Sequence, residues 1–299
     1  MTTKSMRYAL PALLAMAGLL CLWGQPSGAA DGTGAEKPAS LPEPTDQALR
    51  DRERQALMTF YEALGGPDWI QRDFWGSDRP VGEWHGIETD AEGRVVRLTI
   101  YDNNLDGRLS PAVCGLARLH TLHLSLDNLS GPLPDELGKC RALKNLWLKG
   151  NRLTGQIPQS VTELPELEYL DVHANRLSGS LPIVWDTPKL TIFRAEDNKI
   201  AGALPAALFR QPSLEQVFLH NNKLTRSLPP SLANAAQLHS LLLADNALTG
   251  PIPDSLRDAT SLQVLRLNHN RLSGPIPQGL ATRLTVFDVS HNPGLEPGE

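Results

Sequence analysis

Aliphatic residues recur along most of the chain with a period of 24 residues. The segments LKNLWLKGNRLTGQIP from Leu143, LEYLDVHANRLSGSLP from Leu167 and LQVLRLNHNRLSGPIP from Leu262 are close copies of one another. The central aliphatic or aromatic position of each copy is filled by Leu98, Leu122, Leu146, Leu170, Phe193, Val217, Leu241, Leu265 and Phe287. Such regular recurrence is typical of a solenoid, in which every repeat packs only on its neighbours.

Each repeat begins with the pattern LxxLxL, which predicts a short strand. Alternate side chains of a strand point to opposite faces, so the leucines point inward and the residues between them point outward. Stacked repeats would place nine such strands side by side in one parallel sheet on the concave side of the solenoid.

An asparagine follows most of these strands, five residues after the central position, at Asn103, Asn151, Asn175, Asn198, Asn222, Asn246, Asn270 and Asn292. The chain leaves the sheet here and exposes backbone groups to an interior without water. An amide side chain can both donate to and accept from such groups. The sequence therefore predicts a structural asparagine ladder, with one variation at Asp127, which when ionised can only accept.

The second half of each repeat reads LxGxIP or LxGxLP. This signature resembles the plant-type leucine-rich repeats of receptor-like kinase ectodomains, polygalacturonase-inhibiting proteins and secreted bacterial proteins, and the resemblance covers about residues 95–295. It implies an α/β solenoid: a leucine-rich-repeat right-handed superhelix with a concave parallel β-sheet and an N-terminal helical cap. About nine units of 24 residues would occupy 95–299. Arg226 replaces the glycine of this signature, and we expect the backbone to adjust there.

Residues 46–94 are predicted to form the N-terminal cap. Leu57, Phe60, Tyr61 and Leu64 follow the spacing of an amphipathic helix that ends at Gly65-Gly66. The segment after it resembles the cap of this family, with tryptophans as packing anchors at Trp69, Trp75 and Trp84. The family cap usually carries a disulfide in the pattern C-x-W-x-G-x-x-C, but Gly82 and Thr89 occupy those positions here. The cap should therefore depend on tryptophan packing.

The N-terminus has the pattern of an export signal. Lys4 and Arg7 precede an apolar run from Ala9 to Trp23, and small residues end at Ala30. We expect a signal peptide over 1–30, a flexible linker over 31–45, and a secreted, periplasmic or extracellular protein without a membrane span after cleavage. A membrane anchor or a lipid anchor at Cys21 are the less favoured alternatives.

Charge and motifs narrow the function further. Cleavage would remove two basic side chains, so the net charge of −5 becomes about −7, which disfavours nucleic acid as a partner. No GxSxG, P-loop, HExxH or CxxC motif occurs, and we predict no cofactor and no enzyme activity.

Cys140 occupies a core position, and we interpret it as a small buried hydrophobic residue, with a disulfide to Cys114 as the alternative. His173, Glu196 and His220 share one outward column, but two strand spacings between the histidines argue against a metal site.

The outward positions near the middle of the sheet combine aromatic and charged side chains. Folding does not require large rings there, whereas interfaces are enriched in them. The predicted binding patch comprises Tyr101, His123, Trp147, Tyr169, Asp171, His173, Arg194, Glu196, Phe218, His220 and Arg266. The expected partner is a protein, peptide or glycan, and the oligomeric state stays open. A solvated face with cross-strand pairs Asp171–Arg194 and Arg266–Asp288 is the plainer interpretation, and a polysaccharide- or peptide-directed hydrolase is the alternative function.

Overall fold

The computed structural model describes residues 45–296. The predicted signal peptide and all but the last residue of the predicted linker lie outside the described residues. The described residues belong to one compact unit. None of the helices within 45–296 is long and apolar enough to span a bilayer.

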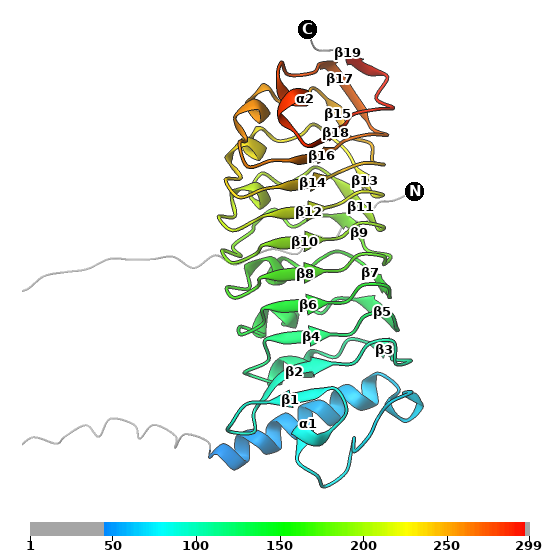
Figure 1. Ribbon diagram of the computed structural model, residues 1–299. Coiled ribbons are helices and arrows are strands. Elements are labelled where there is room, and N and C mark those ends of the chain that lie inside the picture. Colours follow the sequence, from blue (N-terminus) through cyan, green and yellow to red (C-terminus); the bar gives the residue numbers. More distant parts are fainter. Residues whose placement is uncertain (1–44, 297–299) are drawn as a thin grey trace, which may run out of the picture. The chain divides into compact units, whose positions relative to one another are not determined.

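One sheet runs the length of the repeats (Figure 1). Nine of its strands pair in parallel, and β1 (Ile87–Thr89) adds an antiparallel strand at the cap end. The parallel strands are β2 (Val95–Thr99), β4 (Thr121–His123), β6 (Asn145–Trp147), β8 (Tyr169–Asp171), β10 (Ile192–Arg194), β12 (Gln216–Phe218), β14 (Ser240–Leu242), β16 (Val264–Arg266) and β18 (Val286–Asp288). The central residues Leu98 to Leu265 pair with their equivalents in the next repeat and are 0% exposed, while Phe287 in the last strand is partly exposed.

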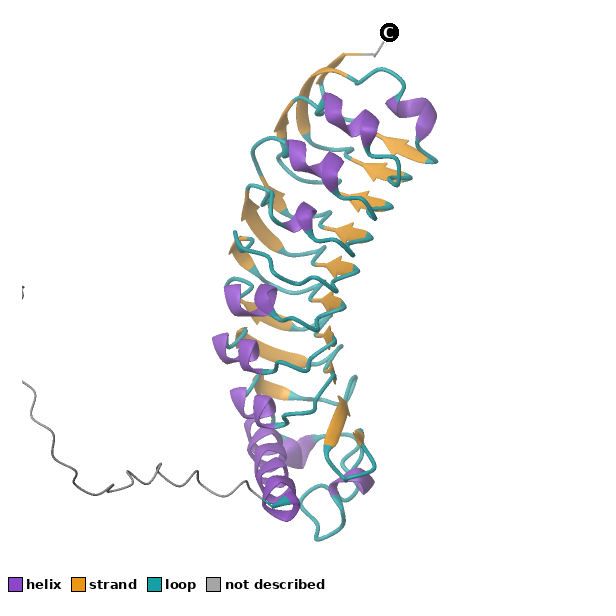
Figure 2. Cartoon of the chain, turned by 90° about the vertical axis from the view of Figure 1, so that its left-hand side faces the viewer, coloured by secondary structure: helices purple, strands orange, loops and turns teal. Residues whose placement is uncertain are grey.

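Short strands also pair on the flank of the solenoid, which the repeat pattern alone did not predict. They form three small sheets: β3 (Asp106–Arg108), β5 (Asn128–Pro132) and β7 (Arg152–Thr154); β9 (Ser178–Ser180), β11 (Lys199–Gly202) and β13 (Lys223–Leu224); β15 (Thr249–Gly250), β17 (Arg271–Pro275) and β19 (Gly294–Glu296). Short helical turns cover the side opposite the main sheet, so that the main sheet lies along the inner side of the curve (Figure 2). These turns are η3 (Pro111–Gly115), η4 (Asp135–Lys139), η5 (Gln159–Glu163), η6 (Leu208–Arg210), η7 (Pro230–Asn234), η8 (Asp254–Asp258) and α2 (Leu280–Arg283).

The asparagine side chains join successive repeats through buried hydrogen bonds. Asn151 is representative: its Oδ1 accepts from the Leu129 N–H at 3.0 Å, and its Nδ2 donates to the carbonyls of Leu124 at 2.8 Å and Leu148 at 3.0 Å. Asp127 accepts from the N–H groups of Asn103 and Leu105, but its Oδ2 is buried without a partner. Each rung thus satisfies backbone groups that would otherwise be orphaned, and the Asp127 rung does so incompletely.

The backbone repeats as regularly as the side chains. The residue before every ladder position adopts a left-handed conformation, at Asp102, Leu126, Gly150, Ala174, Asp197, Asn221, Asp245, His269 and His291. Arg226 also stays left-handed, with φ 68°, like its glycine equivalents Gly202 and Gly250. The expected backbone adjustment at Arg226 is therefore wrong, because stacking against the neighbouring repeats imposes the same local turn on every copy.

The cap covers the first repeat with helix α1 (Asp46–Ala63), which begins at the N-cap Thr45. Leu57 and Phe60 are fully buried, and α1 lies against η3. The rings of Trp69, Trp75 and Trp84 are buried against one another, with centroids 5.0 and 5.1 Å apart along the series. The cap turn η1 (Gly66–Asp68) directly precedes Trp69, and η2 (Val81–Glu83) directly precedes Trp84.

A buried ion pair fastens α1 to the start of the main sheet. The Arg94 guanidinium donates to Glu53 Oε1 from Nε at 2.9 Å and from Nη2 at 2.7 Å, and Glu53 Oε2 accepts from the Val95 N–H at 3.0 Å. Both side chains are almost completely buried. Because three hydrogen bonds satisfy the Glu53 carboxylate, two from Arg94 and one from the first residue of β2, this pair fixes the position of α1 against β2.

Cys114 and Cys140 form a disulfide between the first two convex turns, with their Cα atoms 4.7 Å apart. The favoured interpretation of Cys140 as a free buried hydrophobe is thus wrong. The alternative, a disulfide between Cys140 and Cys114, is confirmed. The two cysteines are 26 residues apart, two more than the repeat period, so they are neighbouring but not equivalent positions of adjacent repeats. Stacking of the two turns brings them within disulfide distance.

Candidate functional site

Four rings make a continuous contact along the concave sheet from the cap end to its middle. Tyr101 stacks on His123 with centroids 4.8 Å apart, His123 meets the edge of Trp147 at 5.0 Å, and Trp147 meets Tyr169 at 5.5 Å. Tyr101 is 55% exposed, whereas the other three rings are half-buried by one another. Four of the residues predicted for the patch therefore form a single aromatic run.

A network of charges adjoins the end of this run. Asp171 Oδ1 lies 2.6 Å from Nδ1 of His173, and Glu196 Oε1 accepts from Nε of Arg194 at 2.9 Å. The guanidinium of Arg194 in turn lies over the ring of Phe218, with 5.2 Å to its centroid. The cross-strand pair Asp171–Arg194 of the plainer interpretation is absent among the ion pairs of residues 45–296, because each partner is paired with a residue two positions further along the chain, just after its own strand.

Burial and charge both shift the titration of the groups in this network. Burial, reinforced by the charge of Lys149, lowers the pKa of the His123 ring below its usual value. Burial and then the charge of Asp171 raise the pKa of the Tyr169 phenol. Burial opposes the charged form of Arg194, but Glu196 and Asp171 together raise its pKa. At neutral pH the run thus presents a neutral imidazole and a phenol O–H beside a permanent cation.

The aromatic run and the charges enclose a hollow of about 300 Å³ on the concave surface. His123, Trp147, Lys149, Tyr169, Asp171 and Arg194 line it. Lys149 takes no part in any ion pair of the described chain. Lys149 was not among the residues predicted for the patch, but it belongs to the same outward column as Tyr101 and His173, and this position is the signal that could have identified it. The hollow offers apolar ring surface together with the donors of Lys149, Tyr169 and Arg194.

Two predicted residues lie apart from the hollow. His220 follows β12, and its Nδ1 is buried without a hydrogen-bond partner. Arg266 ends β16, is exposed, and makes no ion pair with Asp288 within residues 45–296. His173 Nδ1 lies 3.8 Å from Glu196 Oε1, yet no cluster of three or more His, Cys, Asp or Glu within the described range is arranged to hold a metal ion.

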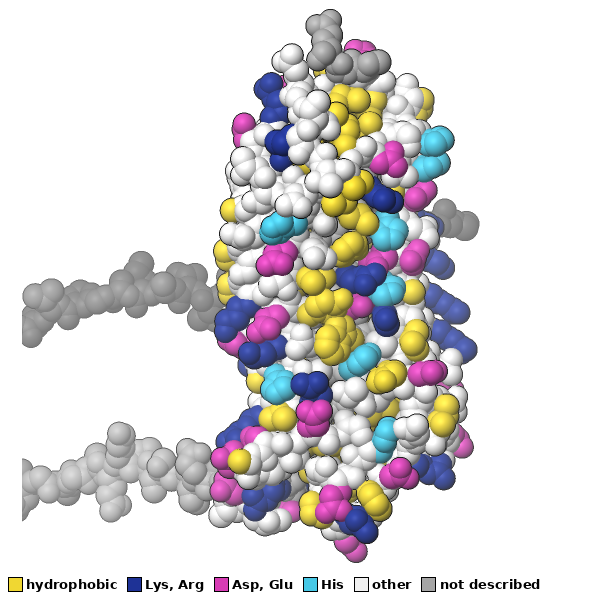
Figure 3. All heavy atoms as spheres, in the orientation of Figure 1, with side chains coloured by type: hydrophobic (Ala, Val, Ile, Leu, Met, Phe, Trp, Pro, Cys, Tyr) yellow, Lys and Arg dark blue, Asp and Glu magenta, His cyan; other side chains and the backbone are white. Residues whose placement is uncertain are grey.

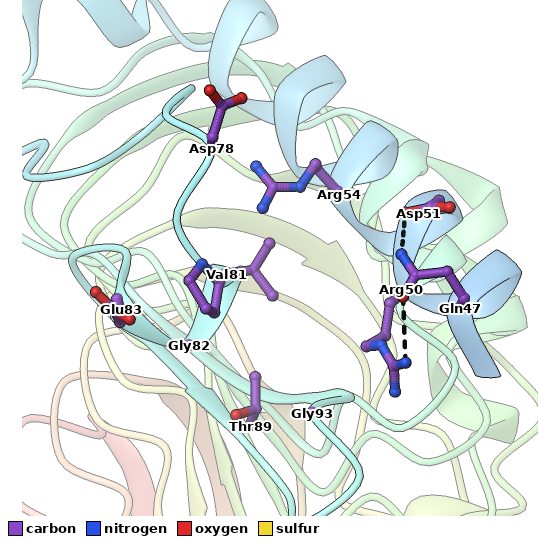
Figure 4. A pocket seen from close by; sticks show the side chains of 11 residues that line it. Gln47, Arg50, Asp51, Arg54, Asp78, Val81, Gly82, Glu83, Thr89 and Gly93 are labelled. Atoms are coloured by element: carbon purple, nitrogen blue, oxygen red, sulfur yellow. Dashed lines mark hydrogen bonds between the residues drawn. The ribbon is translucent and has the colours of Figure 1, made fainter.

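A larger hollow of about 540 Å³ lies in the cap, between α1 and the segment from Asp78 to Thr89. Its lining residues face one another across the gap in Figure 4. Arg50 and Arg54 both line it, but their guanidinium groups donate to the backbone carbonyls of Glu92, Ser77 and Arg79. These arginines serve to tie the cap loops to α1, so the concave hollow is the stronger candidate for ligand binding.

Comparison with known proteins identifies the repeats. Residues 142–164, 213–235 and 261–282 match the family model described as Leucine Rich Repeat. A stretch of 91 residues is 34% identical to the leucine-rich repeat receptor-like serine/threonine-protein kinase SKM1 of Arabidopsis thaliana, and it covers 30% of this chain and 10% of that kinase. The chain therefore matches about a tenth of the length of this relative.

Several solved structures share the fold. The plant peptide hormone receptor RGFR1 in complex with RGF2 gives a TM-score of 0.59 at 28% identity, over 65% of this chain and 35% of the receptor. The Arabidopsis receptor kinase HAESA, in complex with the peptide hormone IDA and the co-receptor SERK1, gives 0.60 at 26% identity, over 78% and 44%. A plant ice-binding protein gives 0.54 at 25% identity, over 83% and 96%. The chain contains plant-type leucine-rich repeats, and its solenoid resembles the leucine-rich-repeat ectodomains of plant receptors.

Proposed function

We propose that this chain is an exported recognition protein that binds an extended peptide segment on its concave face, centred on the hollow between Trp147 and Arg194. The observation that carries the proposal is that one hollow of the sheet joins ring surface, the ammonium group of Lys149, which forms no ion pair within residues 45–296, and the guanidinium of Arg194. Interfaces concentrate their binding energy in aromatic and arginine side chains of this kind. The similar receptors RGFR1 and HAESA, both solved with peptide hormones, support a peptide over a glycan.

The acidic side chains of the hollow favour binding over hydrolysis. Asp171 is 3% exposed and Glu196 is 2% exposed, and each already has a cationic or imidazole partner. A glycosidase needs two carboxyl groups that reach opposite sides of a bound sugar. Because both carboxylates are almost fully buried and already paired, they are not free to act on a bound sugar, and their role is to fix the orientation of His173 and Arg194.

The test is selection of a random peptide library on the immobilised mature protein, followed by affinity measurements on the enriched peptides. Trp147→Ala and Lys149→Ala should each weaken binding, and the exposed convex variant Glu136→Ala should not. Gln159 is unsuitable as a convex control because its side chain bonds Thr162 and the backbone of Val184. Enrichment of no peptide, or binding that survives both concave substitutions, would contradict the proposal.

Export is the second element of the proposed function, and it rests on the charged, apolar and small-residue segments over 1–30. Expression of the full chain in a host with a secretory pathway tests it. The expected result is a protein in the exported fraction whose N-terminus is Asp31. Retention of an intact N-terminus in the cytosol would contradict it.

A further inference from the structure

A row of basic side chains runs along the flank of the solenoid. The residue directly after each ladder position is Arg152, Arg176, Lys199 and Lys223 in four successive repeats, and Arg271 after one interruption at Ala247. This basic row stands out because the chain as a whole is acidic, with a net charge of −5.

The structure places the row on the small flank sheets. Arg152, Lys199, Lys223 and Arg271 begin β7, β11, β13 and β17, and Arg176 lies two residues before β9. All five side chains are exposed. None of them forms an ion pair within 4.0 Å or a side-chain hydrogen bond with any residue of 45–296. Lys and Arg side chains gather along the right-hand edge of the view in Figure 3, beside the flank strands labelled in Figure 1.

Folding gives no reason for this arrangement. Like charges on neighbouring strands repel one another, and each costs stability where no acidic partner intervenes. Elsewhere on the surface the chain does pair its charges between repeats, as in Lys144–Glu168 and Lys189–Glu166. An unpaired row that follows the solenoid axis is instead matched to a ligand with negative charges repeated along its length.

We propose that the basic row binds a linear acidic polysaccharide, with its carboxylates or sulfates on Arg152, Arg176, Lys199 and Lys223. A column of hydroxyl side chains accompanies the row two residues further along most repeats, at Ser130, Thr154, Ser178, Thr225, Thr249 and Ser273. Hydroxyls can donate to and accept from sugar hydroxyls.

The same neighbourhood disfavours the other polyanions. No position of the row or of the hydroxyl column carries an aromatic side chain, which single-stranded nucleic acid would use to stack its bases. Between Arg152 and Thr225, neither column carries a large aliphatic residue that would insert into a lipid surface. The site is also separate from the concave hollow, so occupation of one does not require the other.

The experiment compares binding of the mature protein to alginate, a polyuronate, with binding to carboxyl-reduced alginate of the same length. We expect binding to alginate that weakens steeply with added salt, and none to the reduced polymer. The triple variant Arg176→Gln, Lys199→Gln, Lys223→Gln should lose about tenfold or more in affinity, because three contacts to anionic groups disappear. The matched control Lys139→Gln, Arg210→Gln, Arg257→Gln removes three exposed charges from the convex turns and should stay within about twofold of the wild type.

Four results would overturn the proposal. They are no binding to alginate at low salt, equal binding to the reduced polymer, equal loss in the two triple variants, and tighter binding to single-stranded DNA, polyglutamate or phosphatidylglycerol vesicles than to alginate. Circular dichroism of both variants establishes that the fold is retained, since all six side chains are exposed.

Discussion

A Cβ atom placed on Gly82 would lie 3.6 Å from the Cβ of Thr89 and 2.8 Å from its Oγ1. These are the two positions at which related caps carry cysteine, and a separation of about 3.8 Å between Cβ atoms is that of a disulfide. Gly82 does not have a left-handed backbone, so its backbone conformation allows a side chain, and replacing Thr89 by Cys would remove the Oγ1 atom that lies too close. The backbone at Gly82 and Thr89 thus has the spacing of a disulfide, although neither residue is a cysteine.

The double variant Gly82→Cys, Thr89→Cys should therefore form a disulfide on oxidation. Closing this short loop should raise the free energy of unfolding of the cap by about 2 kcal/mol. Thermal unfolding of the oxidised and reduced forms measures the gain, with each single cysteine variant as control. A double variant that stays reduced under air oxidation would show that the two segments lie further apart in solution.

Asp127→Asn should stabilise the protein by about 1–2 kcal/mol. The buried Oδ2 of Asp127 has no hydrogen-bond partner, whereas the amide of Asn151 one rung later donates to backbone carbonyls. An amide at position 127 would restore that donor and remove a buried charge. Denaturant unfolding of the two proteins at neutral pH measures the difference.

The gain from Asp127→Asn should depend on pH. Burial is the main reason that the pKa of Asp127 is raised above its ordinary value of 3.8. The folded state therefore keeps the proton to higher pH than the unfolded state, and the wild type loses stability as pH rises above about 4. The advantage of the variant should be small near pH 3 and full at pH 7. An advantage that is the same at both values would show that protonation of Asp127 does not stabilise the folded state.

The fold was predictable from the sequence because its determinants repeat. Each central leucine and each ladder asparagine occurs in nearly every copy, so nine parallel strands follow from one motif. The flank sheets, the antiparallel β1 and the Glu53–Arg94 pair were not predictable in the same way. Each of these contacts joins two positions that are not equivalent in the repeat. The 24-residue period relates only equivalent positions, so it does not predict such contacts.

Arg226→Gly should stabilise the repeat region by about 0.5–1 kcal/mol. Arg226 is held at φ 68° where seven other repeats have glycine, and its backbone carbonyl still accepts from the Thr249 N–H at 3.0 Å. A left-handed conformation costs an L-residue about 1–2 kcal/mol. Glycine avoids this cost but loses more backbone entropy on folding, which costs about 0.5–1 kcal/mol, so the substitution should be favourable overall. Arg152→Gly is the matched control, since Arg152 is an exposed flank residue with ordinary φ and should be destabilised by the same change. Equal effects of the two substitutions on the unfolding midpoint would refute the strain at Arg226.

The position of the concave patch followed from strand alternation, but its internal contacts did not. Alternation places Trp147, Tyr169 and Arg194 outward without saying which neighbours they touch. The structure pairs Arg194 with Glu196 and half-buries the rings against one another, so the patch is a packed surface and not a set of separate rings in water. Rotamer choice and competition among several charged partners decide such contacts.

The three rings at the centre of the patch supply the last prediction, which applies to a peptide ligand of the concave face. At least one of Trp147→Ala, Tyr169→Ala and Phe218→Ala should cost about 2 kcal/mol or more of affinity, because these rings offer the largest apolar area for a partner to desolvate. Each should also cost some stability, since Trp147 contacts both His123 and Tyr169, and Phe218 lies beneath Arg194.

Affinity is therefore measured by calorimetry at a temperature where every variant is folded, with Glu136→Ala on the convex side as control. Removal of the positive charge at Lys149 should act mainly on the association rate and should make that rate less sensitive to salt. If all three aromatic variants bind as tightly as the wild type, the ligand uses a lateral or convex surface. The half-buried rings then serve only to pack the concave sheet.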